Sequence, residues 1–429
     1  MKIFLDMVGC RLNQSEIESF ARQFVAAGHT LVEQAAGADL VVINTCTVTA
    51  SAAADSRAKI RQAQRVGAPQ MAVTGCWATL EPEAAAQLAA GAYIIPNDEK
   101  DDLVKKVLPE YELEPIMRQP IPGARRRTRA FIKVQDGCDN HCTFCVTRLA
   151  RGASRSRPIT DVLEDIHVVT RANPSGAADW QAREIVLSGV HLGSWGQDFS
   201  PPLHLHQLIQ AILDHTDVER IRLSSLEPWD LSEKFFRLWE NPRLCHHLHL
   251  PLQSGSSAIL QRMGRKTTPE EFRRLVQTAR EAIKDLAITT DVIVAFPGED
   301  EDNFNESLNF IEEMQFAGGH VFIYSPRPAT PAARLRWDIP LEERKARSRR
   351  TRETLERSAQ HFRQAYIGKT MKVLWESVRS LHAQGWLLSG LTDNYLRVNA
   401  FAPQPLWNQF SLVKVEREEN GELFGTIGE

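Results

Sequence analysis

The sequence predicts a multidomain α/β protein with an open parallel α/β sheet at the N-terminus, a central partial (β/α)6 barrel of the TIM type, and a small all-β barrel at the C-terminus. Three observations predict this class. The 429 residues exceed one ordinary domain. A proline-rich stretch separates two series of alternating strand and helix patterns, and short strands follow a long charged helix. The 43% hydrophobic and 24% charged residues argue against a disordered or fibrous chain.

The first domain, residues 1–108, alternates short apolar runs with Ala-rich helical segments. The expected strands are 2–7, 39–43, 71–74 and 93–95, and the expected helices include 51–65 and 81–90. Asn13 is expected to cap another helix that reaches Gly28. This rhythm predicts a parallel sheet with helices on both faces.

The second domain, residues 125–366, follows a proline-rich segment, 109–124, which we interpret as a linker. Its expected strands are 130–134, 184–188, 220–224, 247–252, 290–295 and 320–324. Helical segments separate these strands, and a long charged helix over 341–366 ends the domain. Six such units predict a partial barrel with its functional loops at the carboxyl ends of the strands.

The third domain, residues 367–429, has five short strand patterns joined by tight turns. They are 371–375, 385–388, 395–398, 412–415 and 423–427, and Asn420-Gly421 is a hairpin signal. This pattern predicts a small all-β barrel.

Charge and hydropathy restrict the location and the partners. The net charge is −3, so any contact with nucleic acid must come from local basic patches. No apolar run reaches the roughly 18 residues of a membrane span, and Asp6 comes too early for a signal peptide. We therefore expect a cytoplasmic protein with no membrane partner. In that reducing compartment the seven cysteines serve metal, redox or core roles rather than disulfides.

The strongest local signal is a C-x3-C-x2-C triplet, Cys138, Cys142 and Cys145, directly after an expected strand. A cubane iron–sulfur cluster takes four thiolates, one per iron. Three thiolates therefore leave one iron open to chelate a small molecule. A zinc site that uses His141 is the competing interpretation, and three core cysteines at this density are disfavoured.

A second, dispersed triplet consists of Cys10, Cys46 and Cys76, each just after the end of an expected strand. The carboxyl ends of parallel strands meet at one edge of an open sheet, where ligands bind. The repeated placement predicts a second three-thiolate cluster site. Cys245 has no such partners, and a core role is expected for it.

These motifs resemble the radical S-adenosylmethionine methylthiotransferase family along nearly the whole chain. The matching segments are 9–14, 44–49, 74–76, 138–145, 151–157, 187–191, 224–228, 250–255 and 291–299. Two departures stand out. The family often has an aliphatic residue and a proline after the third cysteine of the triplet, where this chain has 146–150, so no role is carried over to that segment. Ala295 stands where the family often has glycine.

The resemblance implies two [4Fe–4S] clusters and two uses of S-adenosylmethionine. A sulfur on the auxiliary cluster of Cys10, Cys46 and Cys76 would accept a methyl group from one S-adenosylmethionine. At the cluster of the 138–145 loop, a second would yield the 5′-deoxyadenosyl radical that takes hydrogen from C2 of an adenine. An electron donor such as flavodoxin or ferredoxin is also implied.

The cysteine motifs are most similar to the branch that acts on N6-threonylcarbamoyladenosine at position 37 of tRNA. Sibling branches act on N6-isopentenyladenosine or on an aspartate of a ribosomal protein, and these remain alternatives. The C-terminal barrel resembles TRAM, an RNA-binding module, which favours an RNA substrate. A non-enzymatic cluster or zinc protein that binds RNA is disfavoured by the barrel motifs, and a dinucleotide oxidoreductase by the absence of G-x-G-x-x-G after a strand.

Further residues are candidates for binding the cofactor. They are Ser188, Gly189, Ser224, Glu227, Gln253 and Asp291. The first two end the second barrel strand, where the superfamily meets the methionine amino group, although a simple turn explains them equally. The next three lie at later strand ends that suit ribose hydroxyls and substrate, with a buried structural role as the alternative for Glu227. Asp291 is expected to open the fifth strand, where it is either a ligand or a cap.

Arginines after the cluster loop are candidates for the substrate. Arg151 is the hypothesised contact to the threonylcarbamoyl carboxylate, and a structural salt bridge is the equal alternative. Arg155 and Arg157 are expected phosphate contacts, as are the basic runs at 125–129 and along the 341–366 helix. Five histidines, His204, His206, His246, His247 and His249, suggest a metal site, but ordinary core or surface roles are favoured.

Overall fold

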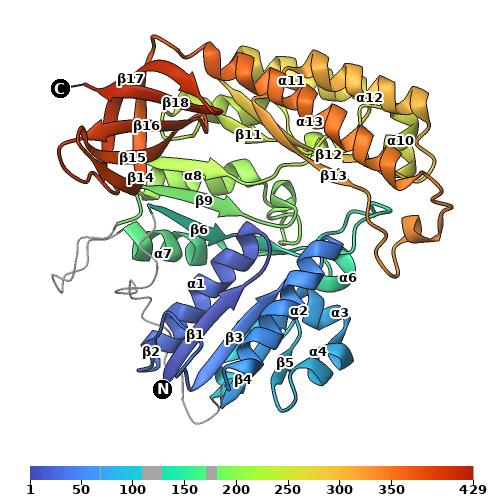
Figure 1. Ribbon diagram of the computed structural model, residues 1–429, viewed down its shortest axis with the longest axis vertical. Helices are drawn as coiled ribbons and strands as arrows, with labels where there is room; N and C mark the ends of the chain where they lie inside the picture. Colours follow the sequence, from blue (N-terminus) through green and yellow to red (C-terminus); the bar gives the residue numbers. More distant parts are fainter. Residues whose placement is uncertain (68, 109–127, 171–180, 429) are drawn as a thin grey trace.

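The computed structural model describes residues 1–67, 69–108, 128–170 and 181–428. The expected linker 109–124 and the basic residues 125–127 lie outside these ranges. Figure 1 shows the N-terminal sheet below the central barrel and the C-terminal barrel at the upper left, beside one end of the central strands. Within the described residues, no helix combines the length and the apolar character that crossing a membrane requires.

The N-terminal domain is a five-stranded parallel sheet in the order β2-β1-β3-β4-β5. Its strands are β1 (Lys2–Met7), β2 (Thr30–Leu31), β3 (Leu40–Thr45), β4 (Gln70–Gly75) and β5 (Tyr93–Ile95). The open parallel sheet is confirmed. Strand β2 was not predicted, because two residues are too few to show a period.

Helices cover both faces of this sheet, as expected. On one face lie α1 (Arg11–Ala26) and α5 (Leu103–Val107), and on the other α2 (Ala50–Arg65), α3 (Cys76–Leu80) and α4 (Pro82–Leu88), with the 3-10 turn η1 (Lys100–Asp102) before α5. Alternate residues of β3 enter the two cores, Val41 on one side and Val42 on the other. The expected cap was wrong: α1 begins at Arg11, and Asn13 lies inside its first turn, where its amide donates to the carbonyls of Val8 and Thr45.

Six parallel strands form the central partial barrel in chain order. They are β6 (Arg129–Lys133), β9 (Glu184–Ser188), β10 (Arg220–Leu223), β11 (His247–His249), β12 (Ala287–Val294) and β13 (Gly318–Ile323). The first three and the last three form two sheets, which parallel bridges Ile221–Leu244 and Ser225–His249 join. The six-strand barrel is therefore confirmed.

Helices and short turns connect these strands. The helices are α6 (Thr147–Arg151), α7 (Ile159–Thr170), α8 (Leu205–His215), α9 (Glu233–Phe236), α10 (Ser257–Arg262), α11 (Pro269–Ala282), α12 (Glu301–Met314) and α13 (Leu341–Gln364). The 3-10 turns are η2 (Leu192–Ser194), η3 (Pro228–Asp230), η4 (Arg237–Glu240) and η5 (Pro331–Arg334). The short strands β7 (Gln135–Asp136) and β8 (Arg155–Ser156) form a separate antiparallel pair. Strand residues such as Ile185, Leu187 and Ile221 pack against the helices in one large core. Because side chains alternate along a strand, Glu184, Arg222 and Ser224 face the barrel interior.

The C-terminal domain is a closed barrel in the order β14-β15-β16-β18-β17. Its strands are β14 (Thr370–His382), β15 (Gly385–Thr392), β16 (Arg397–Ala402), β17 (Phe410–Glu419) and β18 (Glu422–Ile427). The all-β barrel is confirmed, and its core surrounds the fully buried Trp375.

This barrel covers the amino ends of β9 and β10. Arg220 donates to the carbonyls of Leu391 and Lys372, and Arg222 donates to those of Thr392 and Asp393. Arg222 also pairs with Glu184 at 2.7 Å, and both side chains are fully buried. The C-terminal barrel therefore closes the bottom of the central barrel.

Candidate active site

The 138–145 loop begins the site at the carboxyl end of the first barrel strand. Its three cysteines are all partly exposed, and the thiol charges act on one another, Cys138 on Cys145 and Cys145 on Cys142. Burial raises the pKa of Cys142 to about 11. The Cys142 thiol of metal-free protein is therefore protonated at neutral pH, and metal binding must release that proton.

An arginine that the sequence analysis missed supports this loop. Arg265 makes two hydrogen bonds to the Glu227 carboxylate, at 3.1 and 2.6 Å, and its Nη1 lies 3.9 Å from the Cys142 sulfur. Its side chain is 1% exposed. Glu227, with its side chain 21% exposed, thus holds a cation beside a cysteine, and this ion pair favours its structural alternative without the full burial that the alternative expected.

His191 approaches the loop from the other side. Its Nε2 lies 2.6 Å from Asp230 Oδ2, and its Nδ1 lies 3.4 Å from the Asn140 side chain. Burial lowers the pKa of His191, but hydrogen bonds to Asp230 and to Cys138 outweigh it and raise the pKa to about 10. A cationic imidazole therefore faces Cys138 at neutral pH.

The second triplet meets at one edge of the N-terminal sheet. Cys46 directly follows β3, Cys76 begins α3 after β4, and Cys10 precedes α1. Burial raises the pKa of Cys46 to about 11, and the charges of Cys10 and Cys76 both add to this rise. The three thiols therefore lie close enough to influence one another, as their placement after parallel strands predicted.

Two glycines beside these cysteines leave no room for a side chain. A Cβ on Gly9, at φ +120°, would lie 2.7 Å from Cys46 Cβ, and one on Gly75, at φ +93°, would lie 2.3 Å from the Thr45 carbonyl. Each glycine directly precedes a cysteine of the triplet. The two backbone turns therefore require glycine for conformation and for space.

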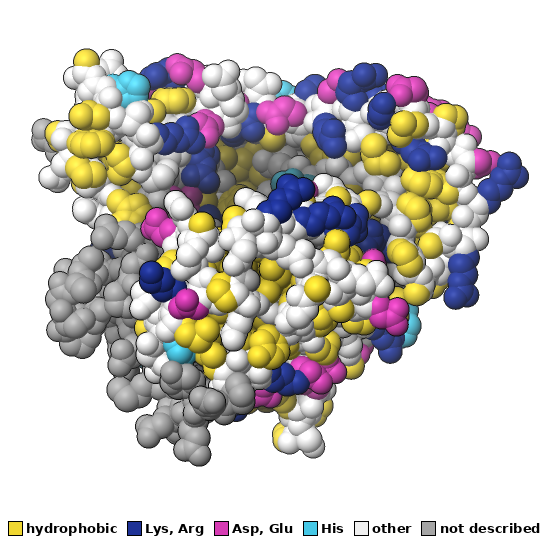
Figure 2. Space-filling view, turned by 60° about the horizontal axis from the view of Figure 1, so that its bottom comes forward, with side chains coloured by type: hydrophobic (Ala, Val, Ile, Leu, Met, Phe, Trp, Pro, Cys, Tyr) yellow, Lys and Arg dark blue, Asp and Glu magenta, His cyan; other side chains and the backbone are white. Residues whose placement is uncertain are grey.

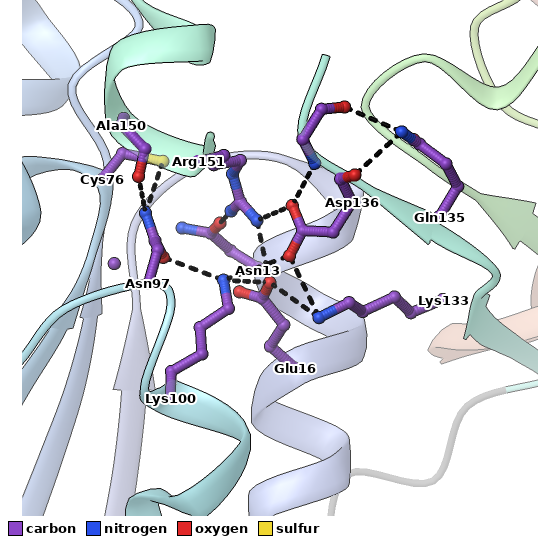
Figure 3. Close-up of polar contacts among 12 residues, drawn as sticks. Asn13, Glu16, Cys76, Asn97, Lys100, Lys133, Gln135, Asp136, Ala150 and Arg151 are labelled. Atoms are coloured by element: carbon purple, nitrogen blue, oxygen red, sulfur yellow. Dashed lines mark hydrogen bonds and ion pairs between the residues drawn. The ribbon is translucent and has the colours of Figure 1, made fainter. Parts of the chain in front are cut away.

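An ion network links the two cysteine sites (Figure 3). Arg151, at the end of α6, is 2.9 Å from both Glu16 and Asp136 and donates to Asn13 at 2.7 Å. Lys100 pairs with Glu16, and Lys133 pairs with Asp136 at 3.0 Å. Glu16 and Lys100 belong to the N-terminal domain, and the other charges belong to the central barrel.

The same network touches the second triplet. Asn97 donates to the Ala150 carbonyl at 2.7 Å, and its Nδ2 lies 3.7 Å from the Cys76 sulfur. The Arg151 charge acts on the thiols of Cys10 and Cys76. Helix α6, which follows the first triplet, is therefore fixed against the second.

These contacts decide between the alternatives for three arginines. Arg151 is buried and pairs with two carboxylates, which favours the structural salt bridge over the substrate contact. Arg157 pairs with Asp165 and donates to the Lys133 carbonyl, so it also has a structural role. Arg155 is exposed on β8 and remains a candidate phosphate contact.

The remaining cofactor candidates divide into two groups. Ser188 donates to the carbonyl of Val186 in its own strand, and Gly189 is packed against Gln135. In contrast, Ser224 Oγ and Asp291 Oδ1 are buried without a hydrogen-bond partner among the described residues. Such orphaned groups are costly unless a ligand satisfies them. They fit a polar ligand in the barrel interior.

Two positions differ from their expected local structure. Asp291 lies in the middle of β12 rather than at its start, so the cap alternative was wrong, and its Oδ2 is 3.4 Å from His249 Nε2. Gln253 has φ +70° and pairs through its backbone with β12. His249 and His247 share the Thr289 hydroxyl in the interior. Among the described residues no group of three or more His, Cys, Asp or Glu side chains is arranged to hold a single metal ion.

The C-terminal barrel also reaches this interior. Tyr395 stacks on His247, with ring centroids 4.5 Å apart, and Arg11 donates to its hydroxyl at 3.0 Å. All three domains therefore meet at one tyrosine. Figure 2 shows the molecule hollowed between the domains, with Lys and Arg side chains along the rim and hydrophobic side chains deeper in.

A partial barrel with a three-cysteine loop at its first strand defines a radical S-adenosylmethionine enzyme. The model of the "Radical SAM superfamily" matches residues 132–311, and that of "Uncharacterized protein family UPF0004" matches residues 2–95. The fold is similar to that of the radical S-adenosylmethionine methyltransferase TsrM from Kitasatospora setae, with a TM-score of 0.57 and 14% identity over 77% of each chain.

Two curated relatives extend the comparison to the whole chain. The "Threonylcarbamoyladenosine tRNA methylthiotransferase MtaB" of Thermotoga maritima is 33% identical over 92% of this chain and 90% of that protein. The "tRNA-2-methylthio-N(6)-dimethylallyladenosine synthase" of Acetivibrio thermocellus is 28% identical over 99% of this chain and 90% of that protein. The chain therefore belongs to the radical S-adenosylmethionine methylthiotransferase family. It is an enzyme of that class, which uses S-adenosylmethionine and [4Fe–4S] clusters.

Proposed function

We propose that this enzyme methylthiolates C2 of N6-threonylcarbamoyladenosine at position 37 of tRNA and uses two S-adenosylmethionine molecules. The observation that carries the proposal is the pair of three-cysteine sites on facing domains, joined by the Arg151 network. In the net reaction the C2–H bond is replaced by a C2–S bond to a methylthio group. The higher identity to the threonylcarbamoyl enzyme, 33% against 28%, supports the choice of substrate.

In this proposal Cys138, Cys142 and Cys145 hold one [4Fe–4S] cluster, and the second triplet holds another. When bound, the clusters supply the electron that cleaves S-adenosylmethionine and the sulfur that is transferred. Three soft thiol donors at each site suit iron–sulfur ligation. Among the described residues no three such side chains converge on a single metal ion, but a cubane does not require this. Each of its thiolates binds a different iron.

The chain's own residues position the reactants. Arg265, held by Glu227, directs a cation at Cys142, and hydrogen bonds to a ligand sulfur adjust the properties of a cluster. Ser224 Oγ and Asp291 Oδ1 offer hydrogen bonds to ribose hydroxyls or to the base. The N-terminal domain, with α1 packed against β6, shields the interior from water.

Substrate choice is tested by incubating reconstituted enzyme with tRNA that carries threonylcarbamoyladenosine, isopentenyladenosine or unmodified adenosine at position 37. Digested nucleosides are then analysed by mass spectrometry. We expect methylthio product from the threonylcarbamoyl tRNA and little from the other two. Product from the prenylated tRNA alone would replace the substrate assignment and leave the enzyme class unchanged. A Cys10→Ala/Cys46→Ala/Cys76→Ala variant is the matched blank.

In this proposal tRNA binds to the C-terminal barrel and to the exposed Arg155. The electron comes from a donor of the flavodoxin or ferredoxin type. Phosphate contacts of this kind give affinity without sequence readout.

A further inference from the structure

Arg11 extends from the second cysteine site into the barrel interior. It is the first residue of α1 and directly follows Cys10. Its Nη2 donates to the hydroxyl of Tyr395 at 3.0 Å, and that ring stacks on His247 in the first position of β11. The guanidinium therefore lies where the N-terminal domain, the C-terminal barrel and the start of β11 meet.

The charge of Arg11 is uncompensated, unlike the charges of its neighbours. Three arginines surround Tyr395. Arg222 pairs with Glu184 at 2.7 Å, and Arg129 pairs with Glu376 at 2.6 Å. For Arg11, no carboxylate lies within ion-pair distance among the residues that the structure describes, and the guanidinium donates instead to the neutral hydroxyl of Tyr395.

The surroundings of Tyr395 are correspondingly positive. Burial raises the pKa of its phenol, but the charges of Arg11, Arg129 and Arg222 outweigh this and hold the pKa below its ordinary value. A half-buried cation that lacks a counterion is a favourable place for an anion, because the anion restores the interactions lost with water.

We infer that Arg11 binds the carboxylate of the threonylcarbamoyl group and thereby selects the substrate; this inference rests on the proposed function. C2 and C6 flank N1 in the adenine ring, so a substituent on N6 begins close to the carbon that receives sulfur. Arg11 directly follows Cys10, so its guanidinium lies within one side chain's length of the site that would deliver the sulfur. The charge of Arg151, the candidate from the sequence, is already compensated by Glu16 and Asp136.

The test compares Arg11→Gln and Arg11→Lys with wild type on tRNAs bearing threonylcarbamoyladenosine, isopentenyladenosine or adenosine at position 37. Binding is measured with iron-loaded protein, and kcat/KM is measured for methylthiolation. Iron content establishes that each variant is intact. For Arg11→Gln we expect affinity for the threonylcarbamoyl tRNA to fall about 10- to 100-fold, the range for losing a hydrogen bond to a charged group. Affinity for the other two should change little, so the wild-type preference should disappear.

Arg11→Lys keeps the charge and should retain most of the preference. Arg155→Gln is the matched control, because replacing that exposed arginine should lower the affinity for all three tRNAs alike. If Arg11→Gln still prefers the threonylcarbamoyl tRNA, the inference is overturned. An equal loss of affinity for all three tRNAs would also overturn it, because that result indicates a phosphate contact. A wild-type preference for the prenylated tRNA would instead refute the proposed substrate, and it would appear before any substitution is made.

Discussion

Replacing Cys138, Cys142 and Cys145 by alanine is expected to halve the iron content and to abolish cleavage of S-adenosylmethionine. Reconstituted wild-type protein should carry about eight irons, four per cubane, and the triple variant about four. The other three thiols lie on a different domain, after β3 and β4 and before α1, so their cluster should survive. Iron analysis and chromatographic detection of 5′-deoxyadenosine measure the two effects.

The complementary variant separates the two sites. Cys10→Ala/Cys46→Ala/Cys76→Ala should also lose about four irons, yet it should still cleave S-adenosylmethionine while it forms no methylthio product. Cys245→Ala is the matched control: this cysteine is 2% exposed in the core beneath β10 and β11 and should leave both iron and cleavage unchanged. Full iron retention in either triple variant, or complete loss of iron from a folded one, would refute the assignment of two sites.

Substituting Glu16 by glutamine is expected to destabilise the iron-free protein by about 3–5 kcal/mol, the usual cost of leaving buried charges uncompensated. The side chains of Glu16, Lys100 and Arg151 are each at most 2% exposed. Without the Glu16 charge, Asp136 alone would face three cations. Urea unfolding, followed by fluorescence, measures the change.

Two controls sharpen this experiment. Adding Lys100→Gln to Glu16→Gln restores the original net charge of the network, so the double variant should be more stable than the sum of the single effects predicts. Glu353→Gln, on the exposed face of α13, should change stability by less than about 0.5 kcal/mol. If Glu16→Gln changes the free energy of unfolding as little as Glu353→Gln does, the network does not stabilise the contact between the two domains.

The same network has a defined pH dependence. Burial raises the pKa of Glu16, but Arg151, Lys100 and Lys133 outweigh it and lower the pKa from 4.5 to about 2. Because the folded pKa lies below the unfolded one, the unfolded chain takes up the proton first. The contribution of Glu16 is therefore complete above pH 4.5 and is lost as the pH falls toward 2. Glu16→Gln should remove this part of the acid sensitivity.

Local sequence patterns determined the fold and the cysteine sites. The alternation of apolar runs with helical segments depends on neighbours in the chain, so it predicted the parallel sheet, the six barrel strands and the closed C-terminal barrel. The 138–145 spacing is also local. The second cysteine site could be predicted because the carboxyl ends of parallel strands converge at one edge of a sheet. This general rule brings Cys10, Cys46 and Cys76 together.

Which charges have a counterion depends on contacts between segments that are far apart in the chain. The sequence shows Arg151 and Arg11 as two arginines near cysteines, and nothing local distinguishes them. Docking of the domains places Glu16 against Arg151, which already pairs with Asp136 of its own domain, whereas it gives Arg11 the hydroxyl of Tyr395, 384 positions away. Glu227 likewise acquires its partner, Arg265, from a distant loop. Pairing energies depend on burial and on distances between segments remote in the chain, so residue type alone cannot predict which arginine remains available to a substrate.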